Sequence, residues 1–257
     1  MAKLIIKYHS QCLRRETTFE LFIPNDPMGY GAEKDERPIR TLFLLHGYTG
    51  SADNWVPEDL SRKYRFAVVC PNGENSFWLD GISTGHSFAT LLGEELPDYL
   101  KDTFGLARSA EDTYILGLSM GGFGALHTAF AYPERFGKVG AMSSALIHRE
   151  VAGMDESGGN EVANFEYYRE CFGDPKKLLG SRNDPEALID GLLAEGKAIP
   201  KIYMCCGTED FLLERNRDMH NFLCDRHVYH LYHESKGSHD MVFWNEYTQK
   251  IVEWMFS

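Results

Sequence analysis

Residues 114–121 read Tyr114-Ile115-Leu116-Gly117-Leu118-Ser119-Met120-Gly121, an apolar run that leads into a turn of small residues with a serine at its tip. Residues 123–130 then have the composition of a helix, which Pro133 would end. A sharp turn from strand to helix exposes a serine oxygen to a neighbouring base, and flanking glycines let the backbone bend without a clash. Because serine is a poor nucleophile without a base, the pattern predicts that Ser119 is an activated nucleophile.

Composition limits the class of protein. The 257 residues suit one large α/β domain spanning 1–257, and a hydrophobic fraction of 43% is enough for a core. The net charge of −12 argues against nucleic acid as a partner, and no apolar stretch is long enough to span a membrane. The N-terminal apolar run is too short for a signal peptide, so we expect a cytoplasmic protein. The six cysteines fit that location as structural thiols rather than disulfides or metal ligands.

Short, nearly continuous apolar runs indicate the central sheet. They do not alternate with polar residues, which is typical of parallel strands buried on both faces. An antiparallel pair over 4–9 and 17–23 precedes them, and the segments 88–104 and 244–254 have helical spacing. The sequence therefore predicts an α/β fold with a mostly parallel central sheet and helices on both faces. The expected parallel strands cover residues 41–45, 66–70, 113–116, 139–142 and 202–206.

One long interval lacks any strand signal. We interpret residues 146–199 as a small, mainly helical cap inserted into the domain, because a structureless loop of that length is improbable. Such sheets place their sites at the carboxyl ends of the strands, so a cap there would cover the site. The alternative is a helical decoration at the periphery. The cap residues available to line a pocket are Met154, Tyr167, Tyr168 and Phe172.

A serine nucleophile needs a base, and the base needs a carboxylate that orients it. In this kind of fold the expected chain order is serine, acid, histidine. Asp210 lies just past the strand expected over 202–206, with Glu209 as the rival acid. His239 follows a strand expected over 228–232 and precedes the C-terminal helix. We therefore expect Ser119, Asp210 and His239 to form a triad.

Other histidines are weaker candidates. His227, His230 and His233 are spaced by three, and the period of two in a strand points neighbouring members to opposite faces. That spacing does not predict a shared metal site, and His220 and Cys224 would add ligands only by coincidence. No metal site is predicted. The lone histidines His9, His127 and His148 are interpreted as structural.

A serine nucleophile that attacks a carbonyl group also needs two backbone N–H groups that stabilise the oxyanion. One is expected from Met120, the residue after the nucleophile. The other is expected from Tyr48, in the loop that follows the strand over 41–45, where Gly47 and Gly50 permit a tight backbone. His46 is expected to brace this loop rather than to take part in chemistry.

With these residues in place, the chain resembles the esterase D / S-formylglutathione hydrolase-like family of α/β-hydrolases, and within it the tributyrin esterase branch most. The resemblance implies the α/β-hydrolase fold, the triad and oxyanion donors named above, and no metal or organic cofactor. S-formylglutathione hydrolases usually carry histidine where Leu118 stands and tend to be longer, which disfavours that role. The shared motifs are Leu44-Leu45-His46-Gly47-Tyr48, Asn54-Trp55, Glu95-Leu96-Pro97, Gly117-Leu118-Ser119-Met120-Gly121-Gly122, Gly207-Thr208-Glu209-Asp210-Phe211-Leu212, and His239-Asp240 with Phe243-Trp244.

The expected function is a serine carboxylesterase that hydrolyses short-chain acyl esters through an acyl-enzyme. The alternatives are an acetyl or feruloyl esterase acting on plant polysaccharide fragments, an S-formylglutathione hydrolase, an acyltransferase, and an inactive hydrolase fold used for binding. Trp55, Tyr168 and Phe172 are the expected substrate-binding residues. The expected partner is a small-molecule ester, with neither nucleic acid nor membrane, and assembly into a homo-oligomer is left open.

Overall fold

The computed structural model describes residues 1–25, 36–51 and 55–257, so Asn54 of the shared motifs lies outside the described residues. Within these ranges the strands form one eight-stranded sheet in the order β1-β2-β4-β3-β5-β6-β7-β8. β1 and β2 pair antiparallel, as does β2 with β4, and every other neighbouring pair is parallel. The strands are β1 (Ala2–Ser10), β2 (Arg15–Ile23), β3 (Arg40–Leu45), β4 (Phe66–Pro71), β5 (Thr113–Leu118), β6 (Lys138–Met142), β7 (Lys201–Gly207) and β8 (His230–Ser235).

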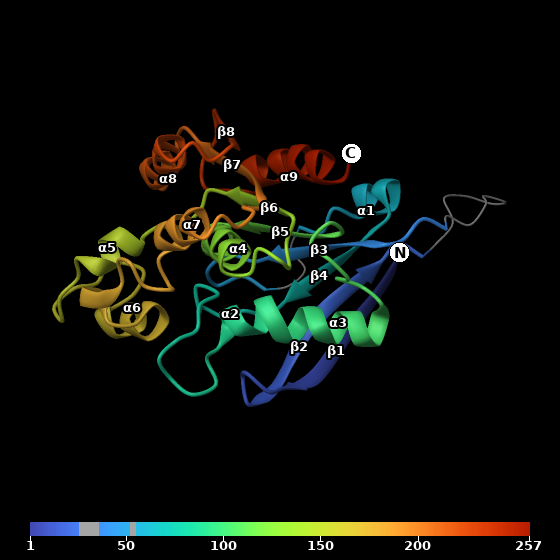
Figure 1. Ribbon diagram of the computed structural model, residues 1–257, viewed down its shortest axis with the longest axis horizontal. Coiled ribbons are helices and arrows are strands. Elements are labelled where there is room, and N and C mark those ends of the chain that lie inside the picture. Colours follow the sequence, from blue (N-terminus) through green and yellow to red (C-terminus); the bar gives the residue numbers. More distant parts are fainter. Residues whose placement is uncertain (26–35, 52–54) are drawn as a thin grey trace.

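Helices cover both faces of this sheet, which confirms the expected α/β architecture (Figure 1). Alternate strand residues pack into two cores. Phe43 and Leu45 face one, with helices α4 (Met120–Ala131) and α8 (Leu213–Asp225). Leu42 and Leu44 face the other, with α1 (Glu58–Tyr64) and α9 (Met241–Phe256). The helices are α1 (Glu58–Tyr64), α2 (Phe88–Thr90), η1 (Leu91–Glu95), α3 (Leu96–Phe104), α4 (Met120–Ala131), α5 (His148–Ala152), α6 (Phe165–Phe172), η2 (Pro175–Lys177), α7 (Pro185–Ala194), α8 (Leu213–Asp225) and α9 (Met241–Phe256).

The helical stripe over 88–104 is interrupted rather than continuous. A π-turn, η1, separates α2 from α3. Pro97 follows this turn and has no N–H to donate to the preceding turn. Gly93 within the turn packs flat against Tyr132, where an added Cβ would lie 2.1 Å from the ring. The absence of a side chain at Gly93 therefore lets this helix approach Tyr132 closely.

The last strand starts later than the sequence suggests. The expectation of a strand over 228–232 is wrong, because β8 runs from His230 to Ser235. His227 has a positive φ of 56°, and the Val228 N–H donates to the Leu223 carbonyl oxygen. These residues close a turn after α8 and leave the strand to begin at His230.

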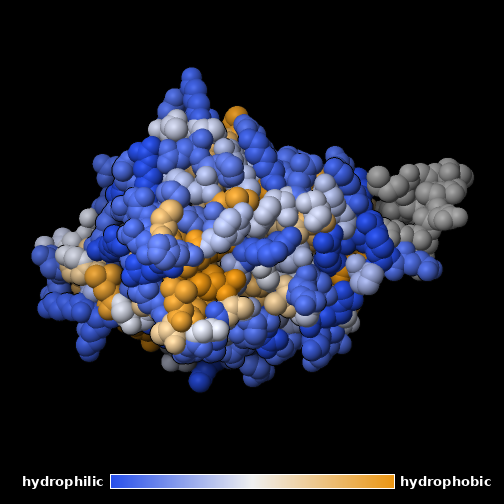
Figure 2. Space-filling view, turned by 45° about the horizontal axis from the view of Figure 1, so that its top comes forward, coloured by the Kyte–Doolittle hydropathy of each residue, from blue (hydrophilic) through white to orange (hydrophobic). Residues whose placement is uncertain are grey.

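The segment between β6 and β7, described throughout, contributes no strand to the sheet. It contains α5, α6, η2 and α7. Figure 1 shows α5 and α6 side by side at the end of the molecule opposite the two chain termini. The face drawn in Figure 2 is mostly hydrophilic, with apolar side chains gathered in a patch near its middle. Within the described ranges, no helix has the length and apolar composition needed to cross a bilayer.

Candidate active site

Ser119 stands in the turn from β5 to α4 with a strained backbone. Its φ of 54° and ψ of −120° fall where residues other than glycine are rarely found. The turn closes tightly, because a Cβ on Gly117 would lie 2.0 Å from the Gly121 carbonyl oxygen. The Ser119 N–H donates to Met142 O at 2.9 Å, which ties the turn to β6. The neighbouring glycines and strands therefore hold the serine hydroxyl at the carboxyl edge of the sheet.

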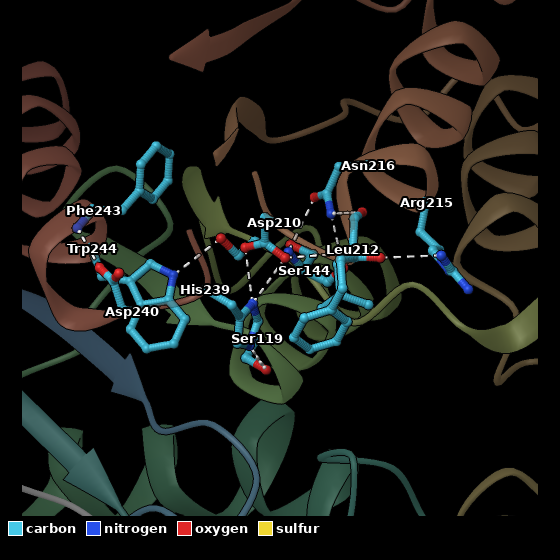
Figure 3. A network of polar contacts seen from close by, with 12 residues as sticks. Ser119, Ser144, Asp210, Leu212, Arg215, Asn216, His239, Asp240, Phe243 and Trp244 are labelled. Atoms are coloured by element: carbon cyan, nitrogen blue, oxygen red, sulfur yellow. Dashed lines mark hydrogen bonds and ion pairs between the residues drawn. The ribbon is translucent and has the colours of Figure 1, made fainter. Parts of the chain in front are cut away.

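Three side chains predicted from the sequence meet at this edge (Figure 3). His239 Nε2 lies 2.9 Å from Ser119 Oγ, and His239 Nδ1 lies 2.9 Å from Asp210 Oδ2. A carboxylate only accepts hydrogen bonds, so Nδ1 carries the proton and Nε2 keeps a lone pair in the neutral ring. The serine O–H can then donate to His239, which is the arrangement that activates a serine for attack.

Asp210 is buried, and its surroundings favour the charged carboxylate. Burial by itself would raise its pKa, but hydrogen bonds from His239, the Leu212 N–H and Ser143 outweigh that effect and hold the pKa below the ordinary value of 3.8. The rival acid, Glu209, is exposed. The structure thus brings Asp210 to the histidine.

Several groups to which the sequence assigned no role hold the histidine. The Trp244 ring meets the His239 ring edge to face at 4.8 Å, and Phe211 packs against it at 4.6 Å. Trp244 Nε1 donates to Ser143 Oγ at 3.1 Å, which fixes the indole. Asp240 caps α9 by accepting from the Val242 and Phe243 N–H groups. The pair His239-Asp240 ahead of an aromatic helix was a usable sequence signal for this N-terminal helix cap. No sequence signal pointed to Ser143.

The loop after β3 approaches the nucleophile closely. A Cβ on Gly47 would lie 2.9 Å from the Leu118 side chain and 3.3 Å from Ser119 Cβ, so only glycine fits there without a shift. Tyr48 follows in this loop, and Met120 is the first residue of α4, so its N–H has no partner within the helix. Both proposed oxyanion donors therefore belong to segments that border Ser119.

His46 braces this loop, as expected. Its Nδ1–H donates to the Gly47 carbonyl oxygen at 2.8 Å, and its Nε2 accepts from the Gly73 N–H at 3.0 Å. Burial lowers its pKa, against the smaller opposing effect of the Gly47 hydrogen bond. The ring is thus held neutral, with both nitrogens occupied.

A cavity of about 770 Å³ opens onto Ser119 and His239. Trp55 and Tyr168 line it, as the sequence predicted, and so do Phe77, Leu118 and Trp244, which were not expected to bind substrate. A volume of this size falls within the range of small-molecule sites in proteins. The cap contributes to its wall through Ile147, Glu150, Asn160, Glu161, Val162 and Tyr168.

Phe172 does not line the cavity, contrary to the expectation that it binds substrate. It is only 1% exposed and is not among the described residues that line the cavity. It lies one turn after Tyr168 at the end of α6, where its ring packs against Phe77 at 4.7 Å and Phe123 at 5.5 Å. The side chain therefore belongs to the hydrophobic core.

Two more cap residues lie elsewhere. Tyr167 donates from its hydroxyl to the Asn75 carbonyl oxygen at 2.6 Å and borders a separate depression. Met154 borders a third. The expectation that these two side chains line the pocket is wrong, because the turns of the cap direct them to other parts of the surface.

The wall of the cavity includes a pair of opposite charges. Glu150 on α5 and Arg215 on α8 line the cavity and form an ion pair with 2.6 Å between Arg215 Nε and Glu150 Oε1. Arg215 also donates to the Phe211 carbonyl oxygen at 3.1 Å. Sequence reasoning missed both residues, because the pair forms only when α5 and α8 are brought together.

Among the described residues, two groups of side chains could hold a metal ion: His148 with Asp184 and Glu186, and His220 with Cys224 and His230. Neither group includes a member of the triad. β8 places His230 beside His220 and Cys224, which nothing in the sequence led us to expect. His233 faces the other side of the strand and stacks on Tyr203, as the alternation of a strand requires.

Comparison with known proteins places this geometry among esterases. The acetyl esterase of Caldicellulosiruptor saccharolyticus is 40% identical over 99% of this chain and 98% of its own. The structure of the fluorophosphonate-binding serine hydrolase FphF from Staphylococcus aureus, with substrate bound, matches with a TM-score of 0.84 at 26% identity, covering 100% of this chain and 98% of that one. The S-formylglutathione hydrolase FrmB from Staphylococcus aureus matches with a TM-score of 0.82 at 25% identity, covering 100% and 99%.

The family model described as putative esterase matches residues 10–255. Its match spans the β5–α4 turn, the loop after β3 and the segments that carry Asp210 and His239. The chain belongs to the putative esterase family and is a serine esterase, a carboxylic ester hydrolase with the α/β-hydrolase fold.

Proposed function

We propose that this esterase hydrolyses short-chain acyl esters, with Ser119 as nucleophile, His239 as base and Asp210 as the group that orients His239. The observation that carries the proposal is the unbroken series of hydrogen bonds from Ser119 Oγ through His239 to Asp210, beside a cavity that reaches the serine. Without that series the serine would be an ordinary alcohol.

The reaction proceeds in two halves. Ser119 Oγ attacks the ester carbonyl carbon while His239 Nε2 takes the serine proton, and the N–H groups of Tyr48 and Met120 stabilise the oxyanion. The tetrahedral intermediate collapses as His239 returns the proton to the leaving alcohol, and an acyl-enzyme remains. Water then repeats the attack with His239 as base, which releases the acid and restores Ser119. Asp210 stays ionised throughout and stabilises the imidazolium.

Short acyl groups are favoured by the walls next to the serine. Leu118, Trp55 and Phe77 are buried, bulky residues that line the same cavity as Ser119, and we propose that they limit the length of acyl chain that fits there. The relative from Caldicellulosiruptor saccharolyticus is named an acetyl esterase, which supports acetyl as one acyl group. The remainder of a cavity of about 770 Å³ then accommodates the alcohol part of the ester.

The polar residues in the cavity wall favour one second candidate substrate. Glu150, Arg215 and Asn160 line the cavity and offer both donors and acceptors of hydrogen bonds. A hydroxyl-rich alcohol suits such groups, so esters of acetylated carbohydrate fragments are the second candidate substrate. This role uses the same triad and differs only in the alcohol.

Hydrolysis of a graded series of 4-nitrophenyl esters tests the acyl preference. Each methylene that fits adds roughly 0.8 kcal/mol of burial, and one that meets the wall costs about 1–3 kcal/mol. We expect kcat/KM to peak between acetate and butyrate and then fall. A rise that continues to decanoate, or methyl ferulate or S-formylglutathione cleaved tenfold better than butyrate, would contradict the proposal. The second candidate is tested by measuring whether the enzyme converts acetylated oligosaccharides, as substrate, into free oligosaccharides, as product.

A cytoplasmic location is also part of this proposal. Among the described residues, Cys12, Cys171, Cys205, Cys206 and Cys224 form no disulfide, and three of these five thiols are buried. Free thiols are typical of proteins kept in a reducing compartment.

A further inference from the structure

Away from the catalytic centre, α8 and β8 bring three metal-ligating side chains together. His220 and Cys224 are four residues apart on α8 and share one face of that helix. The short turn after α8 returns the chain so that His230, at the start of β8, lies beside them. His220 Nδ1 is 2.7 Å from His230 Nε2, and Cys224 Sγ is 3.8 Å from His220 Nδ1.

The hydrogen bond on the far side of His230 leaves a nitrogen ready for a metal. His230 Nδ1 lies 2.8 Å from the Val228 carbonyl oxygen. A carbonyl oxygen only accepts, so Nδ1 carries the proton and Nε2 presents its lone pair toward His220 and Cys224. Histidine ligands of metal ions usually donate their other N–H to a carbonyl or carboxylate in this way, which fixes the ring and raises its basicity.

The second imidazole is also held in place. The His220 ring stacks on the Tyr232 ring with centroids 4.4 Å apart and 19° between the planes. Cys224 is exposed and the two histidines are half-buried, so water and ions reach the cluster from solvent. A thiolate and two imidazoles at such a position leave room for water as a fourth ligand.

The spacing of the donor atoms suits one small ion. Tetrahedral zinc bonds of about 2.0–2.1 Å to nitrogen and 2.3 Å to sulfur put two nitrogens about 3.3 Å apart, and nitrogen and sulfur about 3.6 Å apart. The observed separations of 2.7 and 3.8 Å lie on either side of those values, and all three donor atoms lie within 4.8 Å of one another. Side-chain shifts of roughly half an ångström would let all three bind one ion.

We infer that His220, Cys224 and His230 form a zinc-binding site, with solvent water as the fourth ligand. Sulfur and imidazole ligands select zinc over magnesium and calcium, which prefer oxygen. In the metal-free neutral state, the Nδ1–H of His220 donates to His230 Nε2. On binding, His220 carries its proton on Nε2 instead, and the Cys224 thiol loses one proton to solvent as the sulfur–zinc bond forms.

Such an ion would join α8 to the last strand of the sheet without entering the reaction. β8 is at one edge of the sheet order and pairs with β7 alone among the described strands. Zinc that binds the folded chain and not the unfolded chain raises the midpoint of thermal unfolding. Hydrolysis at Ser119 needs no metal in the mechanism above, so the zinc site and the proposed function can fail separately.

Calorimetric titration of the untagged, EDTA-treated chain with zinc chloride tests the site, together with absorption spectra after adding cobalt. We expect one equivalent of zinc per chain and a thiolate-to-cobalt charge-transfer band in the near ultraviolet. Cys224→Ser should remove that band and weaken zinc binding at least about tenfold, and His230→Gln should weaken it similarly. Zinc should raise the melting midpoint of the wild-type chain and not that of either variant. Esterase activity should be the same before and after EDTA.

His233→Gln is the matched control, because His233 lies on the same strand but faces Tyr203. His148→Gln removes the buried histidine of the other candidate group. Both controls should bind zinc as the wild-type chain does, and melting curves without zinc verify that each variant is folded. The proposal is wrong if the wild-type chain takes up no zinc or if His148→Gln abolishes zinc binding. It is also wrong if Cys224→Ser and His230→Gln both bind zinc with unchanged affinity.

Discussion

At the scale of single residues, the chemistry depends on which nitrogen of His239 carries a proton. Asp210 accepts from Nδ1 with both carboxylate oxygens, at 3.1 and 2.9 Å, so Nε2 faces Ser119 with a lone pair. An amide in place of the carboxylate can donate from its NH₂ group, which favours the tautomer with the proton on Nε2. That tautomer cannot accept the serine proton.

Asp210→Asn should therefore fold normally and lose up to about four orders of magnitude in kcat. Glu209→Gln is the matched control, because Glu209 is the exposed neighbour. Steady-state kinetics on 4-nitrophenyl acetate, with circular dichroism to verify the fold, measures both. If Glu209→Gln were the crippling change and Asp210→Asn the mild one, Asp210 would not be the orienting acid.

At the scale of elements, α6 carries one residue that lines the cavity and one that packs in the core, whereas the sequence predicted that both would bind substrate. Tyr168 lines the cavity, and its hydroxyl donates to Asn160 Oδ1 at 3.0 Å. Phe172, one turn later, lies in the core against Phe77 and Phe123. Helical spacing puts both residues on one face, but the core and the cavity meet along that face.

Phe172→Ala should consequently destabilise the protein by about 3–5 kcal/mol, since it leaves a cavity in a packed core. Leu179→Ala in the same cap is the control, because Leu179 is 57% exposed and its loss should change stability by no more than about 0.5 kcal/mol. Urea unfolding followed by tryptophan fluorescence measures both. Equal stability of the two variants would show that Phe172 does not pack in the core.

At the scale of the whole molecule, one buried histidine makes stability depend on pH. His127 lies in α4 and donates from Nε2 to the Arg182 carbonyl oxygen at 2.8 Å. Burial lowers its pKa from 6.5 to about 4, against a smaller opposing effect of that hydrogen bond. Between these values the unfolded chain binds the proton and the folded chain does not. The contribution to stability is thus complete above pH 6.5 and is lost as pH falls toward 4.

His127→Gln should flatten the fall in melting temperature between pH 6.5 and 4, because it removes a pH-dependent contribution of about 3 kcal/mol at most. His9→Gln, a change at an exposed histidine of β1, should keep the wild-type slope. Calorimetric melting across this pH range compares the slopes. A His127→Gln slope as steep as that of the wild-type chain would contradict the account.

The sequence could predict features that have local signals. The glycines around Ser119, the acid that follows β7 and the histidine ahead of α9 each stand at a strand end, and the parallel sheet brings strand ends to one edge. The strands β3 to β7 include nearly continuous apolar runs, so their parallel pairing was also predictable.

Features that depend on tertiary packing could not be predicted. Glu150 pairs with Arg215 across 65 positions of sequence, and Trp244 reaches Ser143 across 101. The turn at His227 and Val228 shifted the start of β8, and the same turn placed His230 beside α8. Periodicity within one element carries no information on which element it will pack against.

The central claim is that Ser119 is activated by His239 and Asp210. The most direct test uses a fluorophosphonate probe, which labels only an activated serine. The probe is applied to the wild-type chain, to Ser119→Ala, and to Ser109→Ala as a control at an exposed serine. We expect labelling of the wild-type chain and Ser109→Ala, none of Ser119→Ala, and a loss of about a million-fold in ester turnover for Ser119→Ala with an unchanged melting curve. A folded Ser119→Ala chain that is still labelled, or that keeps a tenth of wild-type activity, would contradict the account.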